Sequence, residues 1–261
     1  MRPIILALSM IAILVTADPA KADRRIAFVV GNGTYKNIEQ LPNAPISAKA
    51  VEGLLRNLGF EVFEGIDLTR DQMTERLLEF ASKARGADLA LFYYSGHGFG
   101  ISGAEYLLPI DADVKSEMDV KLGGAINVDL SIDETMGDAK VKLVFLDASR
   151  NNPFPATMAS GKTAARVSVK PAPAEMKPVD NIVTAFAVGP GQAAPDGPAG
   201  TIRPFTRALI ANIAAPGVEI QQAMTKVRAQ VSQETNGRQM SWGHSNLGGE
   251  VYLNPAVAPA K

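Results

Sequence analysis

Short apolar segments that alternate with amphipathic segments restrict the fold of this chain more than any other feature. Five segments are rich in β-branched and aromatic residues, and several are apolar at consecutive positions rather than at every second one. Strands that are covered on both faces of a mostly parallel sheet have this composition. The five predicted strands are residues 25–31, 61–66, 88–95, 140–148 and 181–188.

Apolar residues at helical spacing occupy the segments between and after these strands. The predicted helices are residues 46–58, 68–85, 203–213 and 218–233, and a last short strand is expected within 248–254. Gly59 provides a stop for the first helix, and Thr69 is placed to cap the second. The alternation of strands and helices predicts an α/β sandwich.

The first 22 residues are typical of an export signal. A positive charge at Arg2 precedes an apolar run over residues 4–15, and Ala20-Lys21-Ala22 has the small-x-small pattern of a signal-peptidase site. The apolar run is shorter than the roughly 20 residues that span a bilayer, which favours cleavage over a membrane anchor. We therefore expect a mature chain that begins near Asp23, without stable membrane insertion, in the periplasm or outside the cell.

The composition excludes several kinds of site and partner. The 261 residues include no cysteine, which excludes disulfides, thiolate metal sites and a cysteine nucleophile. His97 and His244 are the only histidines, too few for a multi-histidine zinc site. A formal net charge of -1 gives no general attraction to nucleic acid. We expect no cofactor and no nucleic-acid partner.

A change in composition divides the chain into two parts. Residues 155–180 are rich in Ala, Pro, Lys and Ser, which is typical of an exposed linker. The expected organisation is a signal peptide at 1–22, a single domain over 23–254 that contains this linker, and a flexible tail at 255–261.

His97 and Ser149 are the candidate catalytic residues. His97 follows the third predicted strand between two glycines, which would let the backbone turn sharply and leave the imidazole uncrowded. This setting suits proton transfer, and a loop histidine bonded to nearby backbone is the alternative. Ser149 follows the fourth strand, and the carboxyl ends of parallel strands share one edge of a sheet. A serine needs an aligned base, whereas a thiol with a pKa of about 8.5 is partly ionised at neutral pH. No G-x-S-x-G elbow surrounds Ser149.

Further polar and aromatic residues have less specific settings. Asp147, two residues before Ser149, could orient His97, pair with a cationic substrate group or cap a turn. The segment Arg150-Asn151-Asn152 is better explained as a turn than as a substrate contact. Trp242 could line a substrate cleft, although a lone tryptophan more often covers the core.

Two other segments resemble ligand loops without their spacing. Residues 31–37 are glycine-rich but lack the spacing of nucleotide-binding loops, so a tight turn is expected. A nearby acidic cluster lacks the ordered spacing of a calcium loop, and we expect it to form a solvated face. The cluster consists of Asp111, Asp113, Glu117 and Asp119.

Several stretches together resemble a bacterial member, of orthocaspase type, of the caspase, metacaspase and paracaspase superfamily. They are "FYYSGHGFGISGAEYLLPIDA", "KLVFLDASRNNPF", "TAFAVGPGQAAPDG", "PFTRAL" and "GRQMSWGHSNLGGEVYLN", and the similarity extends from Arg24 to about Asn254. The resemblance implies a caspase-like, three-layer α/β/α sandwich with a mostly parallel central sheet. Residues 23–154 would form the large-subunit-like region, 155–180 the intersubunit linker and 181–254 the small-subunit-like region.

The resemblance also implies roles for single residues. Members of the superfamily are cysteine endopeptidases with a His–Cys dyad; His97 matches the histidine, and Ser149 stands at the position of the cysteine. Asp147 matches one acidic residue of a pocket that selects Arg or Lys before the scissile bond. Ser47 stands where a second acidic residue is usual. Some members respond to calcium, for which this chain shows no motif.

The two departures predict a pseudopeptidase that binds a peptide or protein segment with Arg or Lys, or regulates an active caspase-like relative. One alternative is a weak endopeptidase that uses Ser149 and His97 to cleave after Arg or Lys. Another is an interaction module of the cell envelope. Ser149 is either natural or a replacement for cysteine. For the endopeptidase, candidate sites of self-cleavage in the linker are Lys162, Arg166, Lys170 and Lys177.

Overall fold

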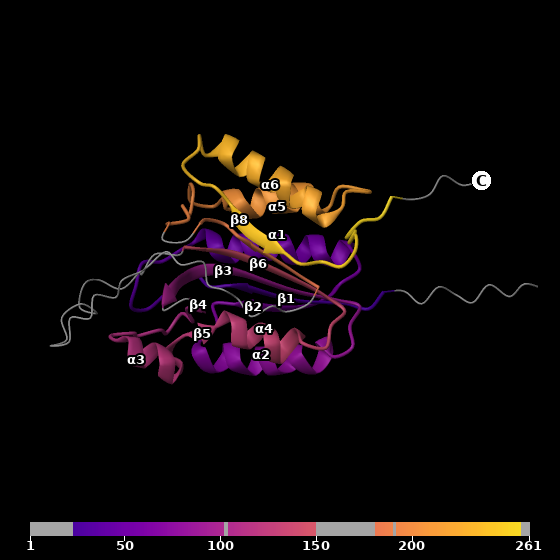
Figure 1. The fold of residues 1–261 in the computed structure, drawn as a ribbon. Helices are drawn as coiled ribbons and strands as arrows, with labels where there is room; N and C mark the ends of the chain where they lie inside the picture. The colour runs from indigo at the N-terminus through magenta and orange to yellow at the C-terminus, as the bar shows by residue number, and fades with distance from the viewer. Residues whose placement is uncertain (1–22, 102–103, 150–180, 190–191, 257–261) are drawn as a thin grey trace, which may run out of the picture.

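The structure of the protein is a computed structural model that describes residues 23–101, 104–149, 181–189 and 192–256 (Figure 1). The expected signal peptide, the expected linker, the predicted turn at residues 150–152 and the candidate self-cleavage sites lie outside the described residues. The Ser149 backbone is described, and its side chain is not.

An eight-stranded sheet forms the centre of the molecule. Its main path has the order β2-β1-β3-β6-β7-β8; the first five of these strands are parallel, and β8 is antiparallel to β7. The strands are β1 (Arg25–Gly31), β2 (Glu61–Ile66), β3 (Leu89–Ile101), β6 (Val141–Ser149), β7 (Ile182–Phe186) and β8 (Trp242–Ser245). Two short antiparallel strands, β4 (Ala104–Leu107) and β5 (Ile126–Asn127), extend from the end of β3. The predicted mostly parallel sheet is confirmed.

Helices cover both faces of the sheet, as Figure 1 shows. One face carries α1 (Asn43–Asn57), α5 (Pro204–Ile213) and α6 (Ile220–Glu234), and the other carries α2 (Arg70–Ala84) and α4 (Val128–Met136). Two apolar cores therefore lie on the two sides of the same strands, which explains why the strands are apolar at consecutive positions. A short helix, α3 (Glu117–Asp119), continues into a π-helical turn over Val120–Gly124 beside β4 and β5. The predicted three-layer sandwich is confirmed.

Local signals set the ends of two helices. The Thr69 side chain accepts a hydrogen bond from the Gln72 backbone, and the Gln72 side chain accepts one from the Thr69 backbone, which forms a capping box before α2. Gly59 follows α1 with a φ of 80°, in the left-handed region that favours glycine. Both predicted helix signals are confirmed.

The third strand is longer than the sequence indicates. It continues past residue 95 to Ile101, so His97 lies inside a strand and not in a turn after it. A Cβ atom at Gly96 would lie 2.5 Å from the hydroxyl oxygens of Tyr35 and Tyr94. Gly96 therefore makes room for two buried tyrosines, and the prediction of a glycine turn here is wrong.

The predicted last strand is also wrong. Among the described residues, the only pairing within 248–254 is an isolated bridge between Glu219 and Tyr252. This segment hydrogen bonds to the residues before α6, because the Ile220 N–H donates to the Val251 carbonyl and the Gly217 N–H donates to the Asn254 carbonyl. The strand that closes the sheet is β8, a few residues earlier.

Across the described ranges, no helix combines the length and apolar character needed to cross a bilayer.

Candidate active site

The ends of β3 and β6 bring the two candidate catalytic residues to neighbouring positions. His97 and Ser149 are paired in the register of these parallel strands, and two residues earlier Ser95 is paired with Asp147. One strand repeat of two residues spans about 7 Å. The expected adjacency of the two strand ends is confirmed, and the roles of His97 and Ser149 stay predictions.

The imidazole of His97 is held by the segment that follows β1. Its Nε2 lies 2.8 Å from the Glu39 carbonyl oxygen, and its ring meets the Tyr35 ring edge-on with centroids 4.7 Å apart. The Tyr35 hydroxyl also accepts the His97 backbone N–H at 2.8 Å. Because a carbonyl can only accept, Nε2 carries the proton, and Nδ1 is the basic atom of the neutral ring.

Burial is the main influence on the protonation of His97. The residue is only 7% exposed, and this burial lowers the pKa of its imidazole. The positive charge of Arg203 lowers the pKa further, while the hydrogen bond to the Glu39 carbonyl acts in the opposite direction. His97 is thus a buried, neutral residue bonded to backbone, and the expectation of an uncrowded imidazole is wrong.

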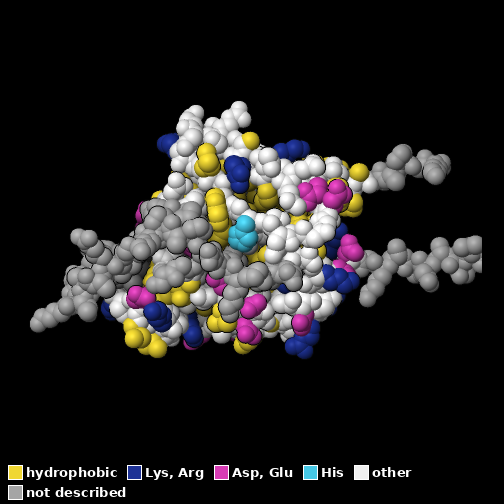
Figure 2. All heavy atoms as spheres, in the orientation of Figure 1, with side chains coloured by type: hydrophobic (Ala, Val, Ile, Leu, Met, Phe, Trp, Pro, Cys, Tyr) yellow, Lys and Arg dark blue, Asp and Glu magenta, His cyan; other side chains and the backbone are white. Residues whose placement is uncertain are grey.

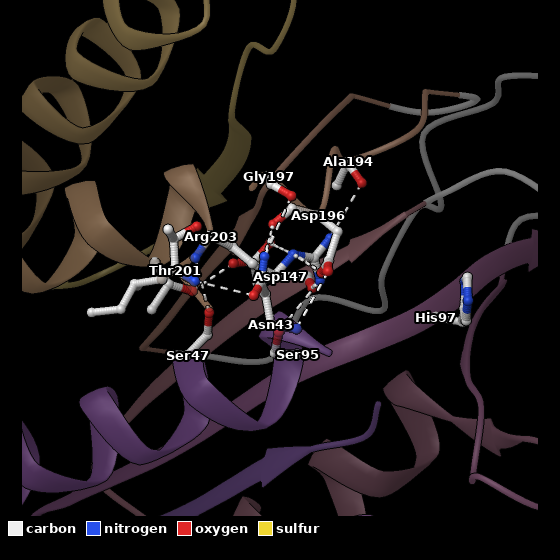
Figure 3. Close-up of polar contacts among 12 residues, drawn as sticks. Asn43, Ser47, Ser95, His97, Asp147, Ala194, Asp196, Gly197, Thr201 and Arg203 are labelled. Carbon is white, nitrogen blue, oxygen red and sulfur yellow. Dashed lines mark hydrogen bonds and ion pairs between the residues drawn. The ribbon is translucent and has the colours of Figure 1, made fainter. Parts of the chain in front are cut away.

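Asp147 pairs with a cation that the chain itself supplies. Its carboxylate is 1% exposed, accepts a hydrogen bond from the Thr206 hydroxyl at 2.5 Å and lies 3.6 Å from Arg203 Nε. This partner is an arginine of the chain and not a substrate group, so the substrate-binding role of Asp147 stays a prediction. Figure 3 shows this cluster between α1, β6 and the loop before α5, with His97 apart from it.

Ser47 faces the same arginine from the other side. It is fully buried in α1, and its hydroxyl accepts the Arg203 backbone N–H at 3.0 Å. A neighbour in the same helix, Asn43, donates its side-chain amide to the carbonyl oxygens of Asp196 at 2.9 Å and Pro198 at 2.7 Å. The Asn43 side-chain oxygen accepts the Gly200 N–H at 2.8 Å, so this one residue holds the loop before α5.

Trp242 lies in β8, beside the other half of the sheet. Its ring packs against Phe186 with centroids 5.8 Å apart and against His244 at 6.0 Å. It also lines a hollow between β8 and α6, together with Thr184 and Met224. The ring thus packs on the core, as lone tryptophans usually do, and its contact with a substrate stays a prediction.

The glycine-rich loop after β1 is occupied by a carboxylate of the chain. Asp67 Oδ1 accepts the backbone N–H groups of Gly33 at 2.8 Å and Thr34 at 2.9 Å. Two successive backbone N–H groups aimed at one oxygen form an anion site, and here the anion is Asp67. Residues 32–38 form an irregular loop with a bend, closed by the Leu41 N–H that donates to the Gly33 carbonyl, so the expected tight turn is wrong.

The acidic cluster after β4 is engaged with neighbouring groups. Asp113 pairs with Lys115 at 2.7 Å, and Glu117 pairs with Lys121 at 2.7 Å. Within the part of the chain that the structure describes, no three His, Cys, Asp or Glu side chains are grouped to hold a metal ion.

Fold and site together define an α/β sandwich with a histidine and a serine at the ends of adjacent central strands. The sequence profile of the caspase domain, a peptidase family, matches residues 24–252. The chain belongs to this family. The family match and the fold confirm the resemblance to the caspase and paracaspase superfamily.

Two curated relatives match a shorter part of the chain. The mucosa-associated lymphoid tissue lymphoma translocation protein 1 of Homo sapiens is 31% identical over 97 residues, which are 37% of this chain and 12% of the relative. The homologue from Mus musculus has the same identity and coverage. The chain thus spans about an eighth of the length of these relatives.

The sequence did not point to Arg203, Asn43, Asp196 or Glu39. The motif "PFTRAL" marked the helix that follows Arg203, but no local pattern shows that this arginine is buried. Glu39 acts through its backbone carbonyl, which no residue type reveals.

Proposed function

We propose that this protein is a caspase-family pseudopeptidase, which keeps a peptide-binding cleft and lacks the sulfur on which efficient cleavage depends. One observation carries the proposal. Burial and the charge of Arg203 lower the pKa of His97, and the group that orients the ring is the Glu39 carbonyl and not a carboxylate.

A serine nucleophile makes heavy demands on its base. The imidazole must take the hydroxyl proton and become an imidazolium, which a carboxylate partner stabilises in Ser-His-Asp sites. His97 is a weaker base than an ordinary histidine, and its Nε2 is bonded to a neutral oxygen. A thiol ionises far more readily and needs less help from its base. The same histidine would therefore serve a cysteine better than it serves Ser149.

The proposed role is to hold a polypeptide segment or to regulate an active caspase-like relative. The expectation that this segment carries Arg or Lys depends on the carboxylate of Asp147. That carboxylate lies against Arg203, so a basic side chain from outside would have to displace the arginine first.

A weak endopeptidase is the second candidate function. The pairing of His97 with Ser149 in the strand register favours it, as does the tautomer in which Nδ1 is unprotonated. This candidate predicts slow cleavage that depends on both residues.

Turnover measurements separate the two candidates. The mature protein, His97→Ala, Ser149→Cys and Ser149→Cys/His97→Ala are compared on fluorescent casein and on a peptide library that varies the residue before the scissile bond. We expect turnover only from Ser149→Cys. Turnover by the mature protein that His97→Ala abolishes would refute the pseudopeptidase. A silent Ser149→Cys variant would favour an interaction module of the cell envelope.

We further propose that the protein is exported, with a mature N-terminus near Asp23. The supporting features are the positive charge at Arg2, the apolar run after it and Ala20-Lys21-Ala22. Mass spectrometry of protein from cell fractions tests this directly. A cytoplasmic protein that keeps residues 1–22 would refute it.

We propose a polypeptide and not a nucleic acid as the partner. Figure 2 shows basic and acidic side chains interspersed on the face it presents, with no field of one sign, and the formal net charge is -1. A phosphate backbone attracts proteins through concentrated positive charge. Retention on heparin or duplex DNA at physiological salt would contradict this proposal.

A further inference from the structure

Arg203 is the bulkiest of the fully buried side chains among the described residues. A charged side chain is rarely buried without compensating partners, because the loss of hydration is costly. The guanidinium has partners on several sides. Nη1 donates to the Asp147 carbonyl at 2.7 Å and to the Ser95 hydroxyl at 3.3 Å, and Nη2 donates to the Ala194 carbonyl at 3.2 Å.

Two carboxylates complete the surroundings of this one cation. Arg203 Nε lies 3.6 Å from Asp147 Oδ1 and 3.6 Å from Asp196 Oδ1. Among the described residues, neither of these oxygen atoms has a hydrogen-bond partner. Burial raises the pKa of Asp196, and the positive charge of Arg203 opposes this shift. Within the described part of the chain, Arg203 Nε has no hydrogen-bond partner either, so charge and not hydrogen bonding attracts it to the two carboxylates.

The frame of the site does not depend on the arginine side chain. Ser95 and Asp147 are fixed by the register of β3 and β6. Asn43 holds the loop with Asp196 through its own hydrogen bonds to backbone groups. The Arg203 backbone has φ −60° and ψ 148°, a conformation that alanine adopts readily before a proline. Removal of the side chain would therefore leave a cradle shaped for a planar cation.

Two of the residues around the Arg203 guanidinium lie two strand positions before the candidate catalytic pair. Ser95 precedes His97 by two residues on β3, and Asp147 precedes Ser149 by two residues on β6. The buried arginine and the candidate catalytic pair therefore lie at the same end of β3 and β6, and a peptide bound at that pair, as proposed, would lie near this site.

We infer that a guanidinium-binding site is formed by Ser95, Asp147, Asp196 and the Ala194 carbonyl, and that the side chain of Arg203 occupies it. The wild type therefore does not select basic peptide side chains there. The inference deepens the proposed function, because it concerns what the same cleft accepts. The wild type is then expected not to select Arg or Lys at this site. Selection for a basic side chain should appear only when the Arg203 side chain is removed.

A small ligand tests the site itself. Arg203→Ala is titrated with ethylguanidinium, which restores the missing atoms, and with ethylurea, a neutral molecule of the same shape. We expect a saturable rise in melting temperature with ethylguanidinium alone. Neither the wild type nor Arg207→Ala, which removes an exposed arginine of α5, should respond. Adding Asp147→Asn to Arg203→Ala should weaken binding by about 10-fold to 100-fold.

Peptide binding tests the consequence for the cleft. Two short peptides that differ only in arginine or citrulline are titrated into each protein. We expect no discrimination by the wild type or Arg207→Ala, and a preference of about 10-fold or more for arginine by Arg203→Ala. Equal responses to ethylguanidinium and ethylurea, or a wild type that already prefers arginine as strongly as Arg203→Ala, would overturn the inference.

The inference can still be tested if Arg203→Ala fails to fold. Arg203→Ala would then be refolded with ethylguanidinium or with equimolar ethylurea. Recovery with ethylguanidinium alone supports the inference, and equal or absent recovery overturns it. These measurements involve no cleavage, so peptide turnover by the wild type would refute the pseudopeptidase and leave the assignment of Arg203 intact.

Discussion

Replacement of Arg203 by methionine should destabilise the protein far more than the same change at Arg207. Methionine keeps much of the aliphatic volume of Arg203 but leaves Asp147, which is 1% exposed, without its cation. Loss of one partner of a buried ion pair typically costs about 3–5 kcal/mol. For a domain of this size, that corresponds to a fall in melting temperature of about 6–20 °C. Arg207 pairs with Glu234 at the surface with its side chain 45% exposed, and such pairs contribute about 0–1 kcal/mol.

A double-mutant cycle identifies the origin of the loss. Asp147→Asn removes the buried negative charge and keeps the shape of the side chain, so Arg203→Met/Asp147→Asn should recover part of the stability lost in Arg203→Met. Urea unfolding, followed by fluorescence and circular dichroism together, gives the four free energies and checks that unfolding is two-state. The reasoning is refuted if Arg203→Met costs no more than Arg207→Met, or if Asp147→Asn brings no recovery.

Three further predictions follow from described contacts. Gly96→Ala places a Cβ atom 2.5 Å from two tyrosine hydroxyls and should lower the free energy of unfolding by about 1–3 kcal/mol. Gly53→Ala, in open space on α1, should instead raise it by up to about 1 kcal/mol, and equal effects of the two changes in urea unfolding would contradict this. Asp67→Ala removes the oxygen that accepts two backbone N–H groups and should cost about 1–3 kcal/mol. An unchanged urea midpoint would exclude this. Burial lowers the pKa of His97 and His244 in the folded protein, so the unfolded chain binds more protons below about pH 6.5 and the free energy of unfolding should fall as the pH drops through that value. His97→Gln and His244→Gln should each reduce the slope of this free energy against pH, and unchanged slopes would disprove the role of these histidines.

Local sequence patterns were sufficient for the frame of the fold. The predicted bounds of β1 and β2 agree with the structure, because consecutive apolar residues between turn signals identify buried strands without knowledge of their neighbours. The capping box at Thr69 is likewise a local device. The adjacency of His97 and Ser149 followed from a general property of parallel sheets, namely that their carboxyl ends meet at one edge.

Tertiary packing decided the features that the sequence did not reveal. The glycines around His97 are typical of a turn, yet Gly96 serves the close approach of Tyr35 and Tyr94 within a strand. β4 and β5 are too short to give a periodic signal, and β8 is stabilised by its pairing with β7. Arg203 is charged and precedes a helix, which normally indicates exposure. Its burial is explained by groups that only the folded chain brings together, among them the Ser95 hydroxyl, the Asp147 carbonyl and the Asp196 carboxylate.

The contacts of Arg203 also bear on the order in which the chain folds. They join residues 56, 108 and 156 positions apart, and the two longer separations exceed the 64 positions between paired residues Arg25 and Leu89 of β1 and β3. Contacts at such separations carry a large loop-closure entropy and belong to the slow part of folding. During synthesis the strand that carries Asp147 leaves the ribosome well before Arg203, so the nascent chain passes through a stage in which this acidic strand end has no counter-ion. The pairing of Arg203 with Asp147 is therefore one of the last features that the protein acquires.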